Sequence, residues 1–291
     1  MATVEHTIWR VGHGRSLYLT ERGAIMAIIN VTPDSFSDGG LHDTVDGAVQ
    51  HALACVEDGA AILDIGGEST RPGAADVSVD EEIARVVPVI SRLRETTEAL
   101  ISIDTYRAAT ARAAVEAGAH IINDVHGLQR EPDIAKVAAE HGSGLCIMHT
   151  GRGREKLADP IADQKHFLEI SLAIAERAGV ARETIMLDPG FGFAKETTEE
   201  NLELMARFEE LHGFGLPLLA GTSRKRFLGA LTGRDAQGRD AATAATTVAL
   251  RLKGASVFRV HNVAINRDAL LVADAMLAAE RRTAAIRKAI V

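Results

Sequence analysis

The chain has few of the features that mark secreted, membrane or nucleic-acid-binding proteins. Only two of its 291 residues are cysteines, Cys55 and Cys146, too few for a disulfide framework or a cysteine-ligated metal centre. Residues 1–16 contain no continuous apolar run, so we expect no signal peptide. The most apolar later stretch, residues 269–279, is interrupted by Asp274 and falls short of the roughly 20 residues that span a bilayer. We therefore expect a cytoplasmic protein with reduced thiols and no membrane contact.

The chain also lacks a block of basic residues. Its 32 lysines and arginines are scattered along the sequence, and its net charge is −8. This balance argues against nucleic acid as the main partner, because nucleic-acid binding depends largely on clustered basic residues. It permits an anionic small substrate, since the local field of a site can oppose the net charge. No low-complexity linker divides the chain, which indicates one domain.

Short apolar runs that are typical of buried strands recur along the chain and alternate with helical patterns. We expect strands at residues 24–30, 61–66, 100–104, 120–124, 144–149, 184–188, 216–222 and 256–261. We expect helices at residues 44–58, 80–98, 107–117, 132–141, 162–178, 198–212, 241–253 and 265–288. Repeated strand–helix units of this kind form a parallel sheet closed by helices. The pattern therefore predicts an α/β fold, a single (β/α)8 TIM barrel built by residues 24–291.

A short extension precedes the first barrel strand. Residues 7–22 read as two β-like runs around a turn at Gly12–Gly14, which is typical of a hairpin. We predict that residues 1–23 form this hairpin extension and that it plugs the bottom of the barrel.

Polar side chains stand at the downstream ends of the predicted strands. They are Asn30, Asp64, Asp104, Asn123, Asp124, His149, Asp188, Ser223, Arg259 and His261. Because the active site of a (β/α)8 barrel lies at the carboxyl ends of its strands, these residues are the candidates for chemistry. Two connections on this face, residues 32–43 and 67–80, are longer than the roughly 2–6 residues usual for such loops. We expect them to act as lids or substrate clamps, with surface padding as the alternative.

Sequence blocks around these positions resemble, in order, those of the dihydropteroate synthase family. The blocks lie at residues 26–40, 63–74, 102–105, 122–125, 187–193, 221–226 and 259–262, and the resemblance covers residues 25–279. Members of this family are transferases that join a dihydropterin diphosphate to p-aminobenzoate, forming a C–N bond and releasing diphosphate. The resemblance thus implies this reaction, in folate biosynthesis, together with a TIM barrel, a homodimer and sensitivity to sulfonamides.

Three of the strand-end residues suit the edge of a pterin ring. Asp104, Asn123 and Asp188 offer carboxylate acceptors and an amide that can accept or donate, as the 2-amino-4-oxo edge requires. For any one aspartate, capping of the next helix is the alternative. The resemblance implies that these three residues, with Thr70 and Lys225, bind the pterin diphosphate. It also implies that Asp104, Asp188 and Lys225 are catalytic.

The ends of the last two strands suit an anion. Many barrels bind phosphate after strands 7 and 8; Arg259 offers a planar fork for phosphate oxygens, and His261 adds a donor. The resemblance assigns both residues to the diphosphate leaving group and assigns Asn30 to Mg²⁺. A single amide oxygen is a weak ligand, which fits Mg²⁺ held mostly by water and substrate phosphates. From the residues alone, Asn30 is read equally well as a loop cap.

The resemblance also implies a p-aminobenzoate pocket, formed by Thr70, Arg71, Pro72, Phe193 and Lys225. Phe193 and Pro72 offer apolar faces for an aromatic ring. The carboxylate of that ring requires hydrogen-bond donors nearby.

The chain departs from the common family pattern at two places. Arg226 follows the Ser-Arg-Lys block where many members carry serine, and residues 148–151 read Met-His-Thr-Gly rather than Met-His-Met-Gln. Arg226 either reaches the benzoate carboxylate or faces solvent. His149 is a candidate general base, but we interpret it as a structural or pterin-neighbouring residue, because an arylamine is already a neutral nucleophile.

Two other functions share parts of this pattern. A pterin-binding methyltransferase has the same barrel and pterin contacts, but it needs neither a diphosphate site nor a benzoate-binding loop. The methyltransferase is therefore disfavoured by the presence of Lys225, Arg259 and residues 69–72. A non-catalytic pterin-binding paralogue is the second alternative, and the presence of every core motif disfavours it.

Overall fold

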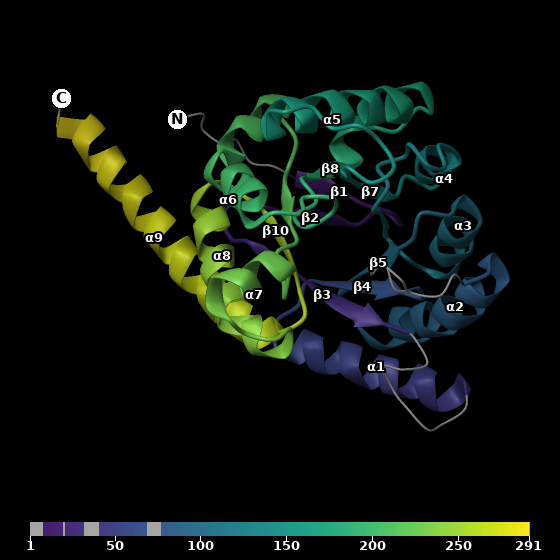
Figure 1. Ribbon diagram of the computed structural model, residues 1–291. Coiled ribbons are helices and arrows are strands. Elements are labelled where there is room, and N and C mark those ends of the chain that lie inside the picture. The colour runs from purple at the N-terminus through teal and green to yellow at the C-terminus, as the bar shows by residue number, and fades with distance from the viewer. Residues whose placement is uncertain (1–7, 20, 32–40, 69–76, 291) are drawn as a thin grey trace.

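Eight parallel strands curve into a nearly closed barrel surrounded by helices (Figure 1). The computed structural model describes residues 8–19, 21–31, 41–68 and 77–290. The barrel strands are β3 (Ala24–Asn30), β4 (Ile62–Gly66), β5 (Leu100–Asp104), β6 (Ile121–Asp124), β7 (Gly144–Met148), β8 (Ile185–Asp188), β9 (Leu219–Ala220) and β10 (Val257–Val260). They pair in the order β8-β7-β6-β5-β4-β3-β10-β9, and a parallel bridge between Leu187 and Leu218 joins the two ends. The predicted TIM barrel is confirmed.

The helices lie where the helical periodicity predicts them, with one addition. They are α1 (Leu41–Glu57), α2 (Val79–Thr96), α3 (Ala108–Ala117), α4 (Asp133–His141), α5 (Pro160–Arg177), α6 (Thr198–Ala206), α7 (Arg226–Thr232), α8 (Asp240–Leu252) and α9 (Val263–Ile290). Three short 3₁₀ segments are η2 (Arg182–Thr184), η3 (Phe208–Phe214) and η4 (Gln237–Arg239). None of the helices in the described ranges has the length and hydrophobicity that a membrane crossing requires. In Figure 1, α9 projects well beyond the barrel.

Three local predictions differ from the structure. The helix expected over residues 198–212 ends at Ala206 and continues as η3. The strand expected over residues 216–222 is regular only at Leu219–Ala220, with Leu218 adding the single bridge to Leu187, and Pro217 has no amide hydrogen to donate to a neighbouring strand. Helix α7 was not predicted, since its seven residues are too few to show a clear helical period.

The strands carry two separate apolar layers. Alternate side chains of a strand point to opposite sides of the sheet, here outward to the helices or inward to the barrel axis. Outward residues such as Leu63, Ile101 and Ile122 belong to the large core between strands and helices. The inner cluster near the start of the strands contains Ala24, Met26, Ile62, Leu100, Ile121, Cys146, Met186, Leu219 and Val257. The barrel is therefore filled by packed side chains at this end.

An N-terminal hairpin completes the inner cluster. Strands β1 (Ile8–Arg10) and β2 (Ser16–Tyr18) pair antiparallel, as the sequence predicts. Trp9 is fully buried against the inner cluster, and its indole Nε1 donates to the carbonyl oxygen of Thr184 at 2.7 Å. The hairpin thus closes the end of the barrel at which the strands begin.

Candidate active site

The opposite end of the barrel interior is polar. Every second residue of a strand points inward, and in five strands an apolar inward residue near the start is followed two positions later by a polar inward residue. The pairs are Ile62 and Asp64, Ile121 and Asn123, Met186 and Asp188, and Val257 and Arg259, while Leu100 is followed by Ser102 and Asp104. Five strands therefore direct hydrogen-bonding groups into one volume at their carboxyl ends.

Arg259 on β10 lies at the centre of this volume. Its Nε donates to Asp64 Oδ2 at 2.6 Å, and its Nη2 donates to Asp104 Oδ2 at 2.6 Å. Asn123 Nδ2 donates to the same Asp64 oxygen at 3.1 Å. Burial opposes the charge of the guanidinium, but the two carboxylates raise the pKa of Arg259 above its ordinary value. The predicted residues Asp104, Asn123 and Arg259 thus form one network.

Asp64 is one of the predicted strand-end candidates, but the sequence assigned it no binding or catalytic role. It stands at a predicted strand end, but its importance depends on its position between Asn123 and Arg259. Its side chain is fully buried, and its Oδ1 has no hydrogen-bond partner among the described residues. The inward alternation from Ile62 was the signal that could have identified it.

Asp104 uses only one of its two carboxylate oxygens. Its Oδ1 is buried without a hydrogen-bond partner in the described part of the chain. Burial raises the pKa of Asp104 to about 7, although Arg259 acts in the opposite direction. Buried polar atoms are normally paired in proteins, so this oxygen is placed to accept an N–H group from a ligand.

A second group of predicted residues gathers beside the ends of β8 and β9. Asp188 Oδ1 accepts the backbone N–H of Gly190 at 2.7 Å, and burial raises the pKa of this carboxyl. The Lys225 ammonium lies 4.1 Å from the centre of the Phe193 ring. Burial lowers the pKa of Lys225 to about 8, with Arg259 acting in the same direction. These residues combine an acceptor, a cation and an aromatic face.

The turn after Asp188 requires glycine. Gly190 has a φ of 63°, and a Cβ atom there would lie 2.0 Å from the carbonyl oxygen of His149.

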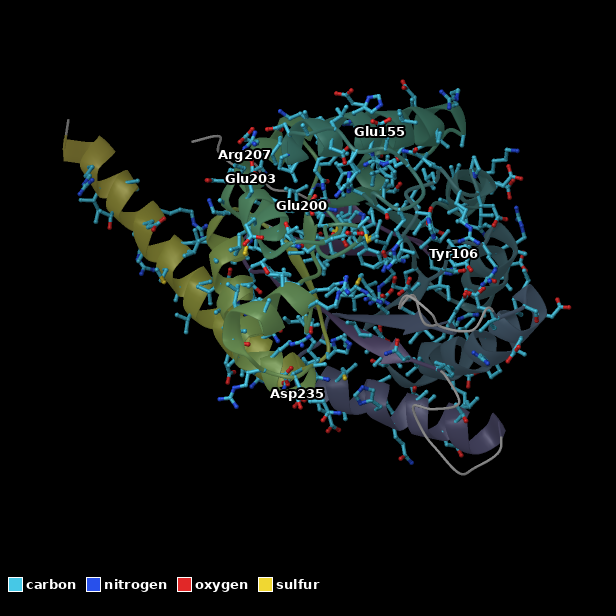
Figure 2. All side chains as sticks on the ribbon, viewed as in Figure 1. Tyr106, Glu155, Glu200, Glu203, Arg207 and Asp235 are labelled. Carbon is cyan, nitrogen blue, oxygen red and sulfur yellow. The ribbon has the colours of Figure 1, made fainter. Side chains whose placement is uncertain are left out.

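Phe193 packs with Tyr106, which is labelled in Figure 2, and with Val125 and Met148.

The structure places the remaining predicted residues as follows. Asn30 ends β3 with an exposed side chain at the barrel mouth. The Ser223 hydroxyl oxygen lies 2.9 Å from His261 Nδ1 and accepts the backbone N–H of His261 at 3.1 Å. Arg226 is the exposed first residue of α7.

Part of the predicted p-aminobenzoate pocket lies outside the described residues. This applies to Thr70, Arg71 and Pro72. It also applies to most of the two long connections, residues 32–40 and 69–76, for which lids or clamps were predicted. No group of three or more histidine, cysteine, aspartate or glutamate residues in the described ranges could hold a metal ion.

His149 has the environment of a structural residue, the interpretation that the sequence favoured. It is buried, and its Nε2 lies 2.9 Å from Asp163 Oδ2. Burial lowers the pKa of His149 to about 4. Asp124 is also structural, because its carboxylate accepts the backbone N–H groups of His126 and Leu128 at 2.8 and 2.6 Å.

Residues 26–261 match the family of pterin binding enzymes. Dihydropteroate synthase of Bacillus subtilis (strain 168) is 46% identical over 262 residues, covering 90% of this chain and 91% of the relative. The chain belongs to the dihydropteroate synthase family.

Solved structures of the family share the fold. Xanthomonas albilineans dihydropteroate synthase with 4-aminobenzoic acid has a TM-score of 0.88 and 44% identity, covering 94% of this chain and 99% of that one. The Clostridium difficile dihydropteroate synthase, solved in the presence of pteroic acid, has a TM-score of 0.85 and 44% identity, covering 88% and 97%. Membership of the family confirms the transferase function that the order of the sequence motifs indicates.

Proposed function

We propose that this chain condenses (7,8-dihydropterin-6-yl)methyl diphosphate with p-aminobenzoate, giving 7,8-dihydropteroate and diphosphate. The observation that carries the proposal is the buried array of Asp104, Arg259, Asp64 and Asn123, with an unpartnered Asp104 oxygen, at the mouth of a barrel of this family. The ligands named for the relatives support the proposal, because 4-aminobenzoic acid is one proposed substrate and pteroic acid has the joined pterin–aminobenzoate skeleton of the proposed product.

The pterin is proposed to bind across the barrel mouth. Asp104 Oδ1 and the carboxylate of Asp188 accept N–H groups of the ring, and Asn123 and Lys225 supply donors for its ring nitrogen and oxo group. Thr70 adds a contact to the pterin diphosphate, as the family resemblance implies. Because the Asp104 site is desolvated, its charge acts on the ring more strongly than it would in water.

Bond cleavage is proposed to precede bond formation. The C–O bond to diphosphate breaks and its electron pair leaves with the diphosphate, while the pterin ring spreads the positive charge of the methylene carbon. Asp104 and Asp188 stabilise that charge, and Arg259 and His261 stabilise the leaving group. The p-aminobenzoate nitrogen then attacks the carbon, and the new C–N bond forms as the nitrogen releases a proton.

Mg²⁺ is proposed to accompany the diphosphate, with Asn30 as its protein ligand. Asn30 occupies an inward position at the end of β3 and is exposed at the mouth, where an amide oxygen can meet a hydrated ion. The lack of a cluster of ionisable ligands in the described ranges fits an ion held mainly by water and phosphate oxygens. When bound, the ion would neutralise charge that develops on the diphosphate.

The aryl pocket is proposed to use Phe193 and Lys225 together with Thr70, Arg71 and Pro72. The Lys225 ammonium lies over the Phe193 ring, so the ring and the carboxylate of a bound aromatic acid can contact these two groups together.

Release of diphosphate from purified protein tests the proposed function. With dihydropterin diphosphate and Mg²⁺, we expect release that depends on p-aminobenzoate and yields dihydropteroate in equal amount. A chelator should stop the reaction, and added Mg²⁺ should restore it. Tight binding of dihydropterin diphosphate without turnover would instead support the non-catalytic paralogue, and methyl transfer from methyltetrahydrofolate would support the methyltransferase.

We propose that the protein is a homodimer that uses the outer face of α9. Leu271, Val272 and Met276 are 53%, 58% and 46% exposed there, whereas Leu270 is buried against the barrel. Sedimentation equilibrium should show a dimer, and Met276→Glu should shift it toward the monomer, with Ile170→Glu, an exposed apolar residue of α5, as the control with the same change of charge. A monomeric wild-type protein would contradict this proposal.

A further inference from the structure

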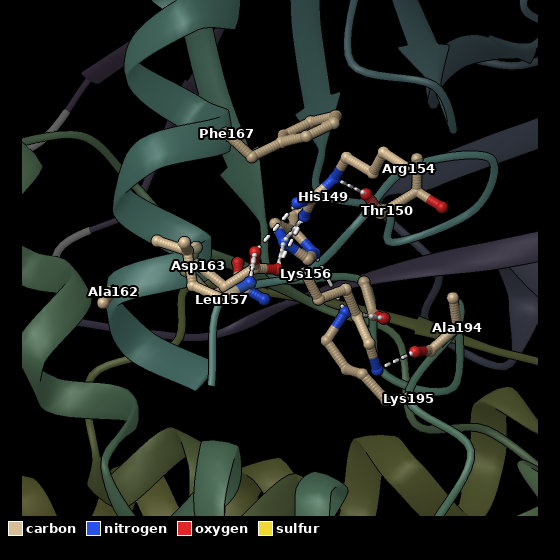
Figure 3. A network of polar contacts seen from close by, with 12 residues as sticks. His149, Thr150, Arg154, Lys156, Leu157, Ala162, Asp163, Phe167, Ala194 and Lys195 are labelled. Carbon is tan, nitrogen blue, oxygen red and sulfur yellow. Dashed lines mark hydrogen bonds and ion pairs between the residues drawn. The ribbon is translucent and has the colours of Figure 1, made fainter. Parts of the chain in front are cut away.

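Lys195 is a buried lysine that the proposed reaction does not use. Lys195 is 6% exposed, and its Nζ donates to the carbonyl of Gly190 at 2.9 Å and to the carbonyl of Phe193 at 3.5 Å. It also donates to His149 Nδ1 at 3.0 Å; both residues are labelled in Figure 3. Among the described residues, no carboxylate lies within ion-pairing distance of this ammonium. Burying a cation among neutral groups costs free energy, so we looked for a function of the three contacts that this ammonium makes.

The segment that Lys195 holds has an uncommon backbone. Gly190, Gly192 and Ala194 have φ values of 63°, 75° and 54°, so every second residue adopts the left-handed region. Ala194 does so with a side chain, a conformation that persists only where the surroundings fix it. Two ammonium groups bind this segment: Lys195 holds the carbonyls of Gly190 and Phe193, and Lys156 holds that of Ala194 at 2.7 Å.

The position of Lys195 is itself fixed from behind by α5. The Asp163 carboxylate accepts two guanidinium N–H groups of Arg154, at 2.8 and 2.6 Å, and the backbone N–H of Leu157 at 2.8 Å. His149 lies between the two groups: its Nδ1 is 3.0 Å from the Lys195 ammonium, and its Nε2 is 2.9 Å from Asp163 Oδ2 and 2.8 Å from Arg154 Nη2. A continuous series of hydrogen bonds therefore runs from α5 to the Gly190–Lys195 segment.

The segment leads directly to the proposed aryl pocket. The Phe193 carbonyl is bound by Lys195, while the ring of the same residue lies 4.1 Å from the Lys225 ammonium and 4.8 Å from the Arg152 guanidinium. A change in the backbone at Phe193 would move this ring. Of the proposed pterin contacts, Asp104 and Asn123 lie on other strands and would be much less affected, whereas Asp188 is joined to this segment through the N–H of Gly190.

We propose that Lys195 is a positioning residue for p-aminobenzoate: its ammonium fixes the backbone that orients Phe193 in the aryl pocket. This inference rests on the proposed function, because it concerns the second substrate of that reaction. Lys195 touches neither reacting atom and acts through Phe193. Its effect should therefore appear in the KM for p-aminobenzoate rather than in the chemical step.

The protonation of Lys195 should control this effect. An ammonium has three N–H donors for its three acceptors, whereas a neutral amine has only two. Burial lowers the pKa of Lys195 to about 7, so one of the three bonds is lost as the pH rises through neutrality. The charged and titratable groups that face it or its partners are His149, Asp163, Arg154, Asp188, Lys225, Lys156 and Glu200.

Lys195→Met tests the inference, because it keeps most of the side-chain volume and removes the donors. We expect the KM for p-aminobenzoate to rise about tenfold, as expected for the loss of one well-placed hydrogen bond, with kcat and the KM for dihydropterin diphosphate nearly unchanged. Lys253→Met is the matched control, since Lys253 also binds a backbone carbonyl, that of Ala206, and a glutamate, Glu209, but lies outside this segment. It should leave the KM for p-aminobenzoate within twofold of wild type.

The pH profile provides a readout that a merely structural role would not change. In wild type, the KM for p-aminobenzoate should rise between pH 6 and pH 7.5, below the pKa of about 8 of Lys225, and in Lys195→Met the rise over this range should be absent. If the Met variant does not fold, the inference is tested by the pH profile of the wild-type KM and by the KM for p-aminobenzoate of Lys195→Gln, which retains two N–H donors. Equal KM increases for both substrates, or no increase, would overturn the inference. A wild-type protein without turnover would refute the proposed function instead.

Discussion

Asp104→Asn is expected to lower kcat by a factor of about 10²–10³, the usual effect of removing one preorganised electrostatic group from an active site. The substitution keeps the size of the side chain but removes its negative charge. The Asp104 Oδ1 is buried and without a partner among the described residues, so it is available to the substrate, while Oδ2 is held by Arg259. Steady-state kcat measured with saturating substrates, together with the thermal midpoint of unfolding, checks the prediction.

Asp124→Asn is the matched control for this experiment. Asp124 is a buried carboxylate on β6, the strand next to β5, but both of its oxygens accept backbone N–H groups. Its substitution should lower the thermal midpoint and leave kcat within a few-fold of wild type. Turnover of Asp104→Asn close to wild type would remove Asp104 from the mechanism.

The pKa of Asp104 predicts that kcat/KM for dihydropterin diphosphate depends on pH. Because burial raises this pKa to about 7, the reactive carboxylate form is lost as the pH falls through neutrality. We therefore expect kcat/KM for dihydropterin diphosphate to fall below pH 7 in wild type. Asp104→Asn should lack this acidic limb, since its side chain does not titrate.

Arg259→Met is expected to reduce both the stability of the protein and its affinity for the pterin diphosphate. Removing the guanidinium leaves Asp64 and Asp104 buried without their shared cation, and breaking a buried ion pair in this way typically costs about 3–5 kcal/mol. The affinity for dihydropterin diphosphate should fall far more than that for the free dihydropterin, because Arg259 is proposed to bind the leaving group. Denaturant unfolding and calorimetric titration with both ligands measure the two effects.

A double substitution separates these two roles of Arg259. Adding Asp64→Asn to Arg259→Met removes one of the two uncompensated charges, so part of the lost stability should return. The affinity for the diphosphate should not return, because the guanidinium is still absent. Equal losses of affinity for the two pterins in Arg259→Met would contradict its assignment to the diphosphate.

Much of the architecture could be predicted because it depends on local patterns. The runs at Ala24–Asn30 and Leu100–Asp104 coincide with β3 and β5, since a buried parallel strand is recognisable as a short apolar run. The family motifs then indicated the function, and the comparisons confirmed it. The errors came where local signals are weak, as in the short helix α7 and around Pro217 before β9.

Local sequence patterns suffice to predict the barrel, the end of the barrel at which polar residues gather, and the family. The contacts among those residues depend on how the distant strands come together. Arg259 contacts Asp64 across 195 residues of chain, and Lys195 contacts His149 across 46. No local pattern encodes such pairs, because the two-residue period specifies only that a side chain points inward. Closure of the barrel brings strands from both halves of the chain together and thereby selects the partners.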